Sequence, residues 1–450
     1  MAQGNAGGVG GLGKFTELRQ RLLFVVGALI VYRIGCFIPV PGVNPDAMLA
    51  MMQAQGGGIV DMFNMFSGGA LHRFSLFALN VMPYISASIV FQLAVHIFPS
   101  LKALQKEGES GRRKITQYSR ISAVLLAVVQ GGSIAVALQN QVAPGGMPVV
   151  YNPGMGFVLT AVVALTAGTI FLMWVGEQVT ERGVGNGVSL IIFAGIVAGL
   201  PVAVINTFSA VNEGSMSVIS LIIIALVVAG FTYFVVFVES GQRRITVNYA
   251  RRQGGRNAYM NQTSFLPLKL NMSGVIPPIF ASSILAFPAT LALWSGQSTS
   301  TLWLQRASQA LAPGEPLHMI VLAALITGFA FFYTALVFNS QETADNLKKS
   351  GALIPGIRPG KATADYVDAV LTRLTAIGSM YLVAVCLLPE IMRTQLGASF
   401  YFGGTSLLIV VVVVMDFIAQ VQAHLMSHQY EGLLKKANLK GSSRGGMARN

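Results

Sequence analysis

Ten long apolar stretches constrain this chain more than any other feature of its sequence. Each is about 20 residues long, the length that an α-helix needs to cross the hydrocarbon core of a bilayer. Charged residues make up 10% of the chain and hydrophobic residues 53%, whereas an ordinary soluble domain has about 25% charged residues. These proportions exclude a soluble enzyme, a disordered protein and a secreted disulfide scaffold. The sequence therefore predicts an all-α polytopic membrane protein with ten transmembrane helices, over residues 22–39, 75–97, 119–139, 155–176, 187–206, 217–238, 274–294, 317–338, 374–391 and 400–422.

Lysine and arginine are concentrated in alternate connections between these stretches. The basic segments are residues 1–21, the loop 98–118, the loops 239–273 and 339–373, and the tail after residue 422. Because Lys and Arg accumulate on the cytosolic side of membrane proteins, these segments are predicted to be cytosolic. An even number of spans then places both termini on that side.

The loops 239–273 and 339–373 are much longer than most of the other connections, and both are basic. The ordinary cytosolic bias explains part of their charge but does not explain their length. Long ordered loops are usually functional, and a basic surface attracts acidic or nucleic-acid-bearing partners. We therefore expect these loops to form a docking surface.

The segment 40–74, on the outer side, is rich in proline and glycine and contains one short apolar stretch, 59–66. Eight residues are too few to span a bilayer. Two interpretations fit the pattern equally well: a re-entrant half-helix sheltered by protein, and a loop on the outer surface.

The sequence shows no convincing enzymatic or cofactor site. A glycine-rich run at 8–14 is followed by Phe15, which has no hydroxyl for Mg²⁺. The glycines of 183–187 lie between two spans, which favours a tight connection with hinge character over dinucleotide binding. His424 and His428 are four residues apart but have no evident third metal ligand. We expect a protein that is not an enzyme, with no catalytic residue, no metal and no cofactor.

A secondary transporter is the main alternative, because ten spans divide naturally into two repeats of five. Ion-coupled transport usually places ionisable residues near the middle of the bilayer. Here the ionisable residues of the spans lie toward the span ends, which disfavours ion coupling but leaves an uncharged substrate open. They are Arg33, Glu177, Glu239 and Asp416.

Several long stretches of the sequence resemble the SecY family, the channel subunits of the bacterial protein-secretion translocon. They include MFNMFSGGAL at 62–71, MPYISASI at 82–89, KEGESGRRKITQY at 106–118 and ERGVGNGVSLIIFAGIVAGLP at 181–201. Others are GQRRITVNYARRQ at 241–253, LPLKLNMSGVIPPIFASSI at 266–284, TADNLKKSGALIPGIRPG at 343–360 and FYFGGTSLLIVVVVVMDFIAQV at 400–421. The resemblance extends from about Arg19 to Lys440.

The resemblance implies two inverted five-helix halves around an hourglass-shaped pore. The halves are 19–206 and 217–422, joined by an outer hinge loop at 207–216, with a flexible N-terminus at 1–18 and a cytosolic tail at 423–450. It also implies that about 61–74 forms a plug helix in the outer funnel, with the plug residues Asn64, Met65, Phe66, Ser67, Gly68 and Gly69.

The resemblance also implies a constriction ring and a lateral gate. The ring positions are Val81, Ile85, Val188, Ile192, Ile279 and Ile409, where aliphatic side chains repel water and close behind any passing chain. Each of them alone would more often be an ordinary packing residue, and we expect the neighbouring Ile191 to lie off the ring. The gate lies between the spans 75–97 and 274–294, with polar positions Ser86, Gln92 and Asn271, and with Phe287 further along the second helix.

The basic loops are, by the same resemblance, docking surfaces for the SecA ATPase and the ribosome. The docking residues are Arg243, Arg244, Arg251, Arg252, Arg256 and Arg358; Asn257 stands where relatives often have a second arginine. The implied function is a channel in the bacterial cytoplasmic membrane that passes unfolded signal-bearing polypeptides and releases membrane segments sideways into lipid. The implied partners are SecE, SecG, SecA, the ribosome, signal sequences and preproteins, together with YidC, SecDF and membrane lipid.

Overall fold

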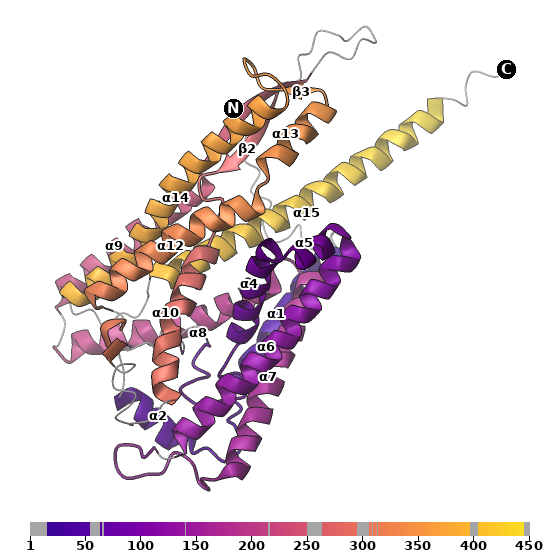
Figure 1. Ribbon diagram of the computed structural model, residues 1–450. Helices are drawn as coiled ribbons and strands as arrows, with labels where there is room; N and C mark the ends of the chain where they lie inside the picture. The colour runs from indigo at the N-terminus through magenta and orange to yellow at the C-terminus, as the bar shows by residue number, and fades with distance from the viewer. Residues whose placement is uncertain are drawn as a thin grey trace.

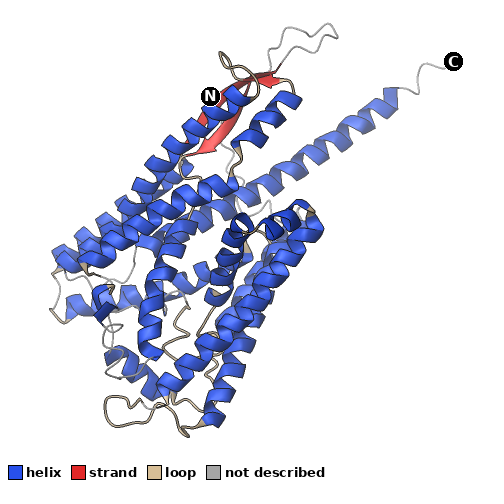
Figure 2. Ribbon diagram, viewed as in Figure 1, coloured by secondary structure: helices blue, strands red, loops and turns tan. Residues whose placement is uncertain are grey.

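The computed structural model describes residues 16–54, 64, 67–139, 141–214, 217–249, 263–294, 306–307, 309–312, 314–396 and 404–444. Most of these residues are helical, and the long helices form one bundle with a small sheet at one end (Figures 1 and 2). A mostly helical membrane fold is what the apolar stretches predict.

In the part of the N-terminal half that the structure describes, seven helices surround an alanine-rich core. They are α1 (Thr16–Gly35), α2 (Pro45–Ala54), α4 (Met82–Ile97), α5 (Pro99–Lys106), α6 (Glu109–Leu138), α7 (Met155–Arg182) and α8 (Gly187–Asn212). Helices α6 and α7 contact each other along their length. Their contact is close because Ala127 and Ala161 are fully buried beside Leu165, and small side chains let two helices approach each other in a membrane.

Among its described residues, the C-terminal half has five long or medium helices and one short amphipathic helix. They are α9 (Val218–Ser240), α10 (Ile276–Trp294), α12 (Pro316–Val337), α13 (Ser340–Lys349), α14 (Lys361–Leu396) and α15 (Gly404–Arg444). Helix α12 packs between α10 and α14. Helix α15 continues well beyond the bundle, on the same side as the sheet (Figure 1).

The two long basic loops meet in one three-stranded sheet, which the sequence analysis did not anticipate. The strand order is β2-β1-β3, with β1 (Gln242–Tyr249), β2 (Thr263–Lys269) and β3 (Ala352–Leu353). Both pairings are antiparallel, with Ile245 opposite Leu266 and Asn248 opposite Leu353. The sheet covers an apolar cluster that includes Val247, Leu268, Val367 and Leu371. The loops therefore form a subdomain with a core of its own.

Seven of the described helices are long and apolar enough to cross a membrane, and an eighth is obtained if the bent pair α4 and α5 counts as one span. The two are bent by 97° at Phe98, where Pro99 begins α5. Helix α10 has a shorter apolar section, Ile276–Leu285, and α1 carries four charged residues among its twenty. The ten predicted spans are thus consistent with the structure, although their boundaries differ.

The differences in boundaries have local causes. Helix α6 begins at Glu109, so it includes much of the predicted loop 98–118. Helix α4 begins only at Met82, because residues 67–81 form successive turns in which Phe74 and Asn80 have positive φ. The outer segment contains α2, whose Ala47, Met48 and Met51 are buried against the α6–α7 pair. Residues 55–63 of the predicted re-entrant stretch lie outside the described residues.

Candidate functional site

All six predicted ring positions lie in one apolar cluster, to which both halves of the chain contribute side chains. Val81, Ile192 and Ile409 are buried members of this cluster, and Ile85, Val188 and Ile279 pack against it from partly buried positions. The cluster contains aliphatic side chains from both halves, because Ile279 is on α10 and Ile409 is on α15. The structure thus brings together residues more than 300 positions apart in the sequence.

Helix starts fix the position of four of these side chains. Val81 is the N-cap residue of α4, and Ile85 follows one turn later with its N–H bonded to the Val81 carbonyl at 3.0 Å. Val188 and Ile192 occupy the first two turns of α8, which is capped by Asn186. The Asn186 Oδ1 accepts from the backbone nitrogens of Val188 and Ser189 at 3.1 and 3.2 Å, satisfying donors that a helix start otherwise leaves free.

Ile191 also belongs to this cluster and is buried. Its Cδ1 lies 3.5 Å from the place where a Cβ on Gly176 of α7 would stand. Val188 Cγ2 lies nearer to the same place, at 3.2 Å, so the absence of a side chain at Gly176 makes room for both residues. That Ile191 lies off the ring stays a prediction.

The predicted tight connection at 183–187 is held by bonds from three other helices. The Gly187 N–H donates to Thr180 Oγ1 at 2.8 Å, and Arg21 of α1 donates to the Gly183 carbonyl at 3.4 Å. The Gly185 N–H donates to Gln420 Oε1 of α15 at 2.9 Å. Gln420 was not among the residues singled out by sequence, since a glutamine near the end of a membrane helix carries no distinctive pattern.

The predicted gate residues do not form one polar contact set. Ser86 is partly exposed on α4, and Gln92 is exposed and donates to Ser88 Oγ at 3.5 Å. Asn271 is buried just before α10, where its amide donates to Glu239 at 2.7 Å and its Oδ1 accepts from Ser273 at 3.1 Å. These partners of Asn271 all belong to the C-terminal half. Helix α10 nevertheless contacts both α4 and α6, and Phe287 lies on α10 with its side chain outside the described part of the chain.

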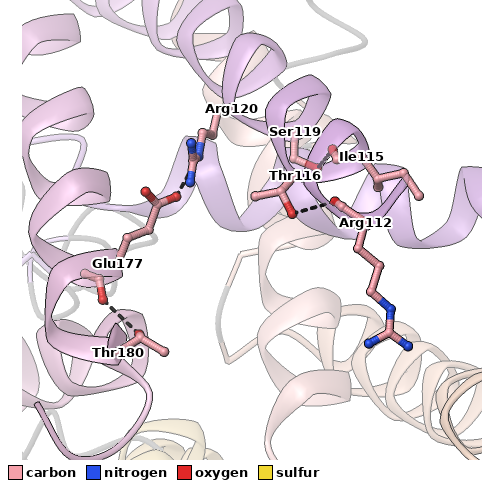
Figure 3. Close-up of polar contacts among 8 residues, drawn as sticks. Arg112, Ile115, Thr116, Ser119, Arg120, Glu177 and Thr180 are labelled. Carbon is pink, nitrogen blue, oxygen red and sulfur yellow. Dashed lines mark hydrogen bonds and ion pairs between the residues drawn. The ribbon is translucent and has the colours of Figure 1, made fainter. Parts of the chain in front are cut away.

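An ion pair that the sequence analysis missed joins α6 and α7 (Figure 3). Arg120 Nε donates to Glu177 Oε1 at 2.7 Å, with Arg120 about half exposed and Glu177 more buried. The two residues are 57 positions apart, so no local spacing rule could have paired them. Their contact lies beside the α7–α8 connection, because Thr180 is on the next turn of α7 (Figure 3).

The docking arginines that the structure describes are exposed on the sheet subdomain. Arg243 and Arg244 lie on β1. Arg358 follows a turn containing Gly356, whose φ is +82°, and the Arg358 carbonyl accepts from Thr363 Oγ1 at 2.9 Å. Ile354 and Ile357, on the approach to Arg358, pack in the same cluster as Ile245. Arg251, Arg252 and Arg256, with Asn257, lie outside the described residues.

The described plug residues form a compact turn against α1. Ser67 Oγ donates to the Asn64 carbonyl at 3.0 Å, and the Gly69 N–H donates to the same carbonyl at 3.0 Å. Ser67 and Gly68 are buried and Gly69 is partly exposed. Met65 and Phe66 lie outside the described residues. Among the described residues there is also no group of three or more side chains able to hold a metal ion.

Comparison with known proteins identifies the family. The family model for SecY matches residues 75–418, which is most of the chain. The chain belongs to the SecY family. It is similar to the protein translocase subunit SecY of Escherichia coli, with 59% identity covering 97% of each chain. It is also similar to that subunit in Pseudomonas aeruginosa, with 57% identity covering 96% of this chain and 97% of the relative.

Solved SecY-family channels share the fold. A protein-conducting channel structure has a TM-score of 0.64 and 16% identity, and the match covers 91% of this chain and 93% of that one. A second structure, of a channel whose plug domain stabilises the closed state and maintains a membrane seal, also has a TM-score of 0.64, with 17% identity over the same shares. A yeast complex bound to the yeast 80S ribosome has a TM-score of 0.61 and 14% identity, with 89% of each chain covered.

Membership of the SecY family decides between the functions that composition left open. The chain is a protein-conducting channel subunit of the protein translocase, and it is not an enzyme. The secondary transporter alternative is wrong, since the chain matches SecY over nearly its full length. The resemblance noted in the sequence is confirmed, as is a membrane fold with several apolar helices.

Proposed function

We propose that unfolded polypeptides cross the membrane through a ring formed by Val81, Ile85, Val188, Ile192, Ile279 and Ile409. The observation that carries this proposal is the convergence of all six side chains, from both halves, in one apolar cluster. Aliphatic side chains offer water no hydrogen bonds, so a narrow ring of them stays dry and blocks ions when no chain is inside. The same ring yields to any side chain, since it makes no fixed polar contact.

The lateral exit for membrane segments lies between α4 and α10. Two features support this location: α10 contacts α4 and α6 across the boundary between the halves, and Pro277 and Pro278 stand in its first turn. Proline fixes φ and lacks an N–H that would have no partner in a first turn, so the two prolines mark where α10 begins at this boundary. Ser86 and Gln92 supply the polar side of α4, while Asn271 fixes the start of α10 through its bond to Glu239.

The sheet subdomain is the docking surface for partners that drive transport. Its support is the exposed Arg243, Arg244 and Arg358, which the pairing of β1 with β3 brings to one subdomain. Exposed arginines suit rRNA phosphates and acidic protein surfaces, which they contact through two parallel hydrogen bonds. We assign SecA and the ribosome to this surface. SecE and SecG are assigned as the other subunits, because the relatives are translocase subunits.

The proposed location is the bacterial cytoplasmic membrane with both termini in the cytosol. The concentration of basic residues in the sheet loops supports this orientation. The C-terminal end of α15 projects on the same side as the sheet, which is consistent with it (Figure 1).

Reconstitution tests the proposal. The chain, with SecE- and SecG-type subunits in vesicles, is expected to move an unfolded preprotein inward only when a SecA-type ATPase and ATP are both present. A preprotein without a signal sequence is the matched control and is expected to stay outside. Uptake that needs neither the ATPase nor ATP would contradict the proposal.

A further inference from the structure

One end of α1 holds two of the plug residues, Ser67 and Gly68, through side-chain donors. Tyr32 Oη donates to the Ser67 carbonyl at 3.1 Å, and Cys36 Sγ lies 3.7 Å from the same oxygen. Arg33 donates to the Gly68 carbonyl at 2.7 Å. Tyr32 and Cys36 lie one turn apart on one face, because the Cys36 N–H bonds to the Tyr32 carbonyl at 3.2 Å. We call Ser67 and Gly68 the plug foot.

The backbone conformation and the tight surroundings at the second residue of the plug foot favour glycine. Gly68 has a φ of +66°, and a Cβ there would stand 3.1 Å from the Cα of Gly195 on α8 and 3.2 Å from Tyr32 Oη. The foot is therefore wedged between α1 and α8 by backbone contact. Gly195 is one turn beyond Ile192, so the helix that contacts the foot also carries two ring residues.

Residues 74–77, which follow the plug foot in the sequence, are held mainly by backbone hydrogen bonds. The Leu76 N–H bonds to the Ile38 carbonyl at 2.9 Å, and the Val40 N–H bonds to the Phe74 carbonyl at 3.0 Å. The Phe77 ring stacks on Tyr32 with centroids 6.1 Å apart. Backbone pairing thus fixes residues from Phe74 onward, while α1 holds the foot through side-chain donors.

Phe74 lies at the boundary between these two parts and has a φ of +43°. Such a conformation is unfavourable for a bulky residue, and it persists only where the surroundings enforce it. Phe74 is completely buried, which provides that enforcement. Phe74 therefore begins the part of the chain that backbone pairing holds in place, and residues 69–73 connect it to the plug foot.

We propose that Tyr32, Arg33 and Cys36 are positioning residues that anchor the plug foot in the closed channel and release it when a polypeptide enters. This inference rests on the proposed function of the chain. Arg33 contributes most, since a hydrogen bond from a charged donor is stronger than one from a neutral hydroxyl or thiol. The anchor sets how readily the channel opens, because the foot must leave three donors at once.

The native thiol of Cys36 reports directly on release of the foot. Cys36 is completely buried in this structure, with its sulfur 3.7 Å from the Ser67 carbonyl oxygen. The second cysteine, Cys386, is buried in the C-terminal half. Labelling of the assembled translocase with a membrane-impermeant maleimide from the outer side therefore measures how often Cys36 becomes accessible, and the Cys36→Ser variant gives the background.

Two variants weaken the anchor by different amounts. Arg33→Gln removes the charge, and we expect Cys36 to be labelled about tenfold faster than in the unsubstituted chain. Tyr32→Phe removes one oxygen while keeping the ring on Phe77, and we expect an increase of about fivefold. Arg19→Gln, the same change at an exposed position of the same helix, is expected to leave the labelling rate unchanged. A preprotein trapped in the unsubstituted channel is expected to accelerate labelling as well.

Three results would overturn the inference. They are unchanged labelling in both anchor variants, equal acceleration in Arg19→Gln, and unchanged labelling when a trapped preprotein is present. If Arg33→Gln fails to accumulate, Tyr32→Phe decides the test, because it alters a single atom. Failure of the proposed function is distinct, since then the unsubstituted translocase would trap no preprotein at all.

Discussion

Gln420 of α15 accepts a hydrogen bond from the backbone N–H of Gly185 at 2.9 Å, which joins the C-terminal half to the α7–α8 connection of the N-terminal half. Phe417, one turn earlier on α15, packs beside the same glycine: its Cδ2 lies 3.5 Å from where a Cβ on Gly185 would stand. Val188 and Ile192 follow directly on α8. The contact therefore ties the two halves next to the side chains proposed to seal the pore.

Replacing Gln420 with Ala should make the resting channel open more often. The change removes one bond between the halves, worth about 0.5–1.5 kcal/mol, so we expect the opening frequency in planar bilayers to rise severalfold. Gln422→Ala is the matched control, since Gln422 is exposed on the same helix. An equal rise in both variants would show that the Gly185 contact is not the cause.

Replacing Ile409 or Ile279 with Asn should let ions leak through the resting channel. An amide in the ring offers hydrogen bonds to water and lowers the barrier to wetting. A shift of about 1.4 kcal/mol toward the open state raises a rare open fraction tenfold, measured as single-channel conductance, and preproteins with poor signal sequences should be accepted.

The matched controls for the ring are Ile418→Asn on α15 and Ile284→Asn on α10, because both isoleucines are 48% exposed. Ile191→Asn is not a matched control, since Ile191 is buried in the same apolar cluster as the ring residues. If Ile418 and Ile284 leaked as readily as Ile409 and Ile279, the ring assignment would be refuted. Val81→Ile and Val188→Ile should leave the leak unchanged or reduce it.

Replacing Arg358 with Glu should impair SecA-driven export far more than ribosome-driven membrane insertion. The charge reversal places like charges against each other where an acidic partner surface is proposed to dock. We expect the SecA-driven export rate to fall to about one tenth of its unsubstituted value or below. Both routes are measured in vesicles. Arg373→Glu is the control, because Arg373 is exposed on α14. Equal loss of export and insertion would argue against a specific SecA contact.

Replacing Leu268 with Ala should unfold the sheet subdomain locally while the bundle remains intact. Leu268 is only 1% exposed within the cluster under the sheet, and truncating such a leucine costs about 2–5 kcal/mol. Hydrogen exchange of β1 and β2 measures the effect, and SecA-driven export should fall with it. Leu353→Ala is the control, because Leu353 is 39% exposed on β3 and its truncation should have little effect. If hydrogen exchange of β1 and β2 increased equally in both variants, the apolar cluster would not be what stabilises the sheet.

Some features of this fold could be read from local pattern. Asn186 before Gly187 is a helix cap that sequence can suggest, and the apolar run on α15 needs no partner to be recognised. The break between α4 and α5 can also be predicted, because a proline such as Pro99 interrupts a helix that precedes it. Residues such as Arg120 and Glu177 could not be paired in advance, because ion pairs between helices follow no sequence spacing.

The three-stranded sheet is the clearest example of a structure that the local sequence pattern did not predict. Residues 245–249 do alternate between apolar and polar, but this run is only five residues long, 263–269 contains Pro267, and β3 has two residues. Short strands of this kind are stable only when they pair and cover a core. The strands pair across two different loops, and the apolar cluster that they cover includes residues of α14. The sequence could therefore predict that the two basic loops are functional, but it could not predict that they form one subdomain.

By itself the sequence determined the medium in which this protein folds, the number of apolar segments and the family to which it belongs. Those properties depend on composition, on segment length and on motifs that are contiguous in the chain. Tertiary structure alone decided which side chains meet: the six aliphatic positions in one cluster, Gln420 on Gly185, and Tyr32 and Arg33 on the plug foot. The physical reason is that hydrogen bonds and packing act over a few ångströms in space, whereas the hydrogen-bonded partners are 35 or 235 positions apart along the chain and the cluster extends from Val81 to Ile409.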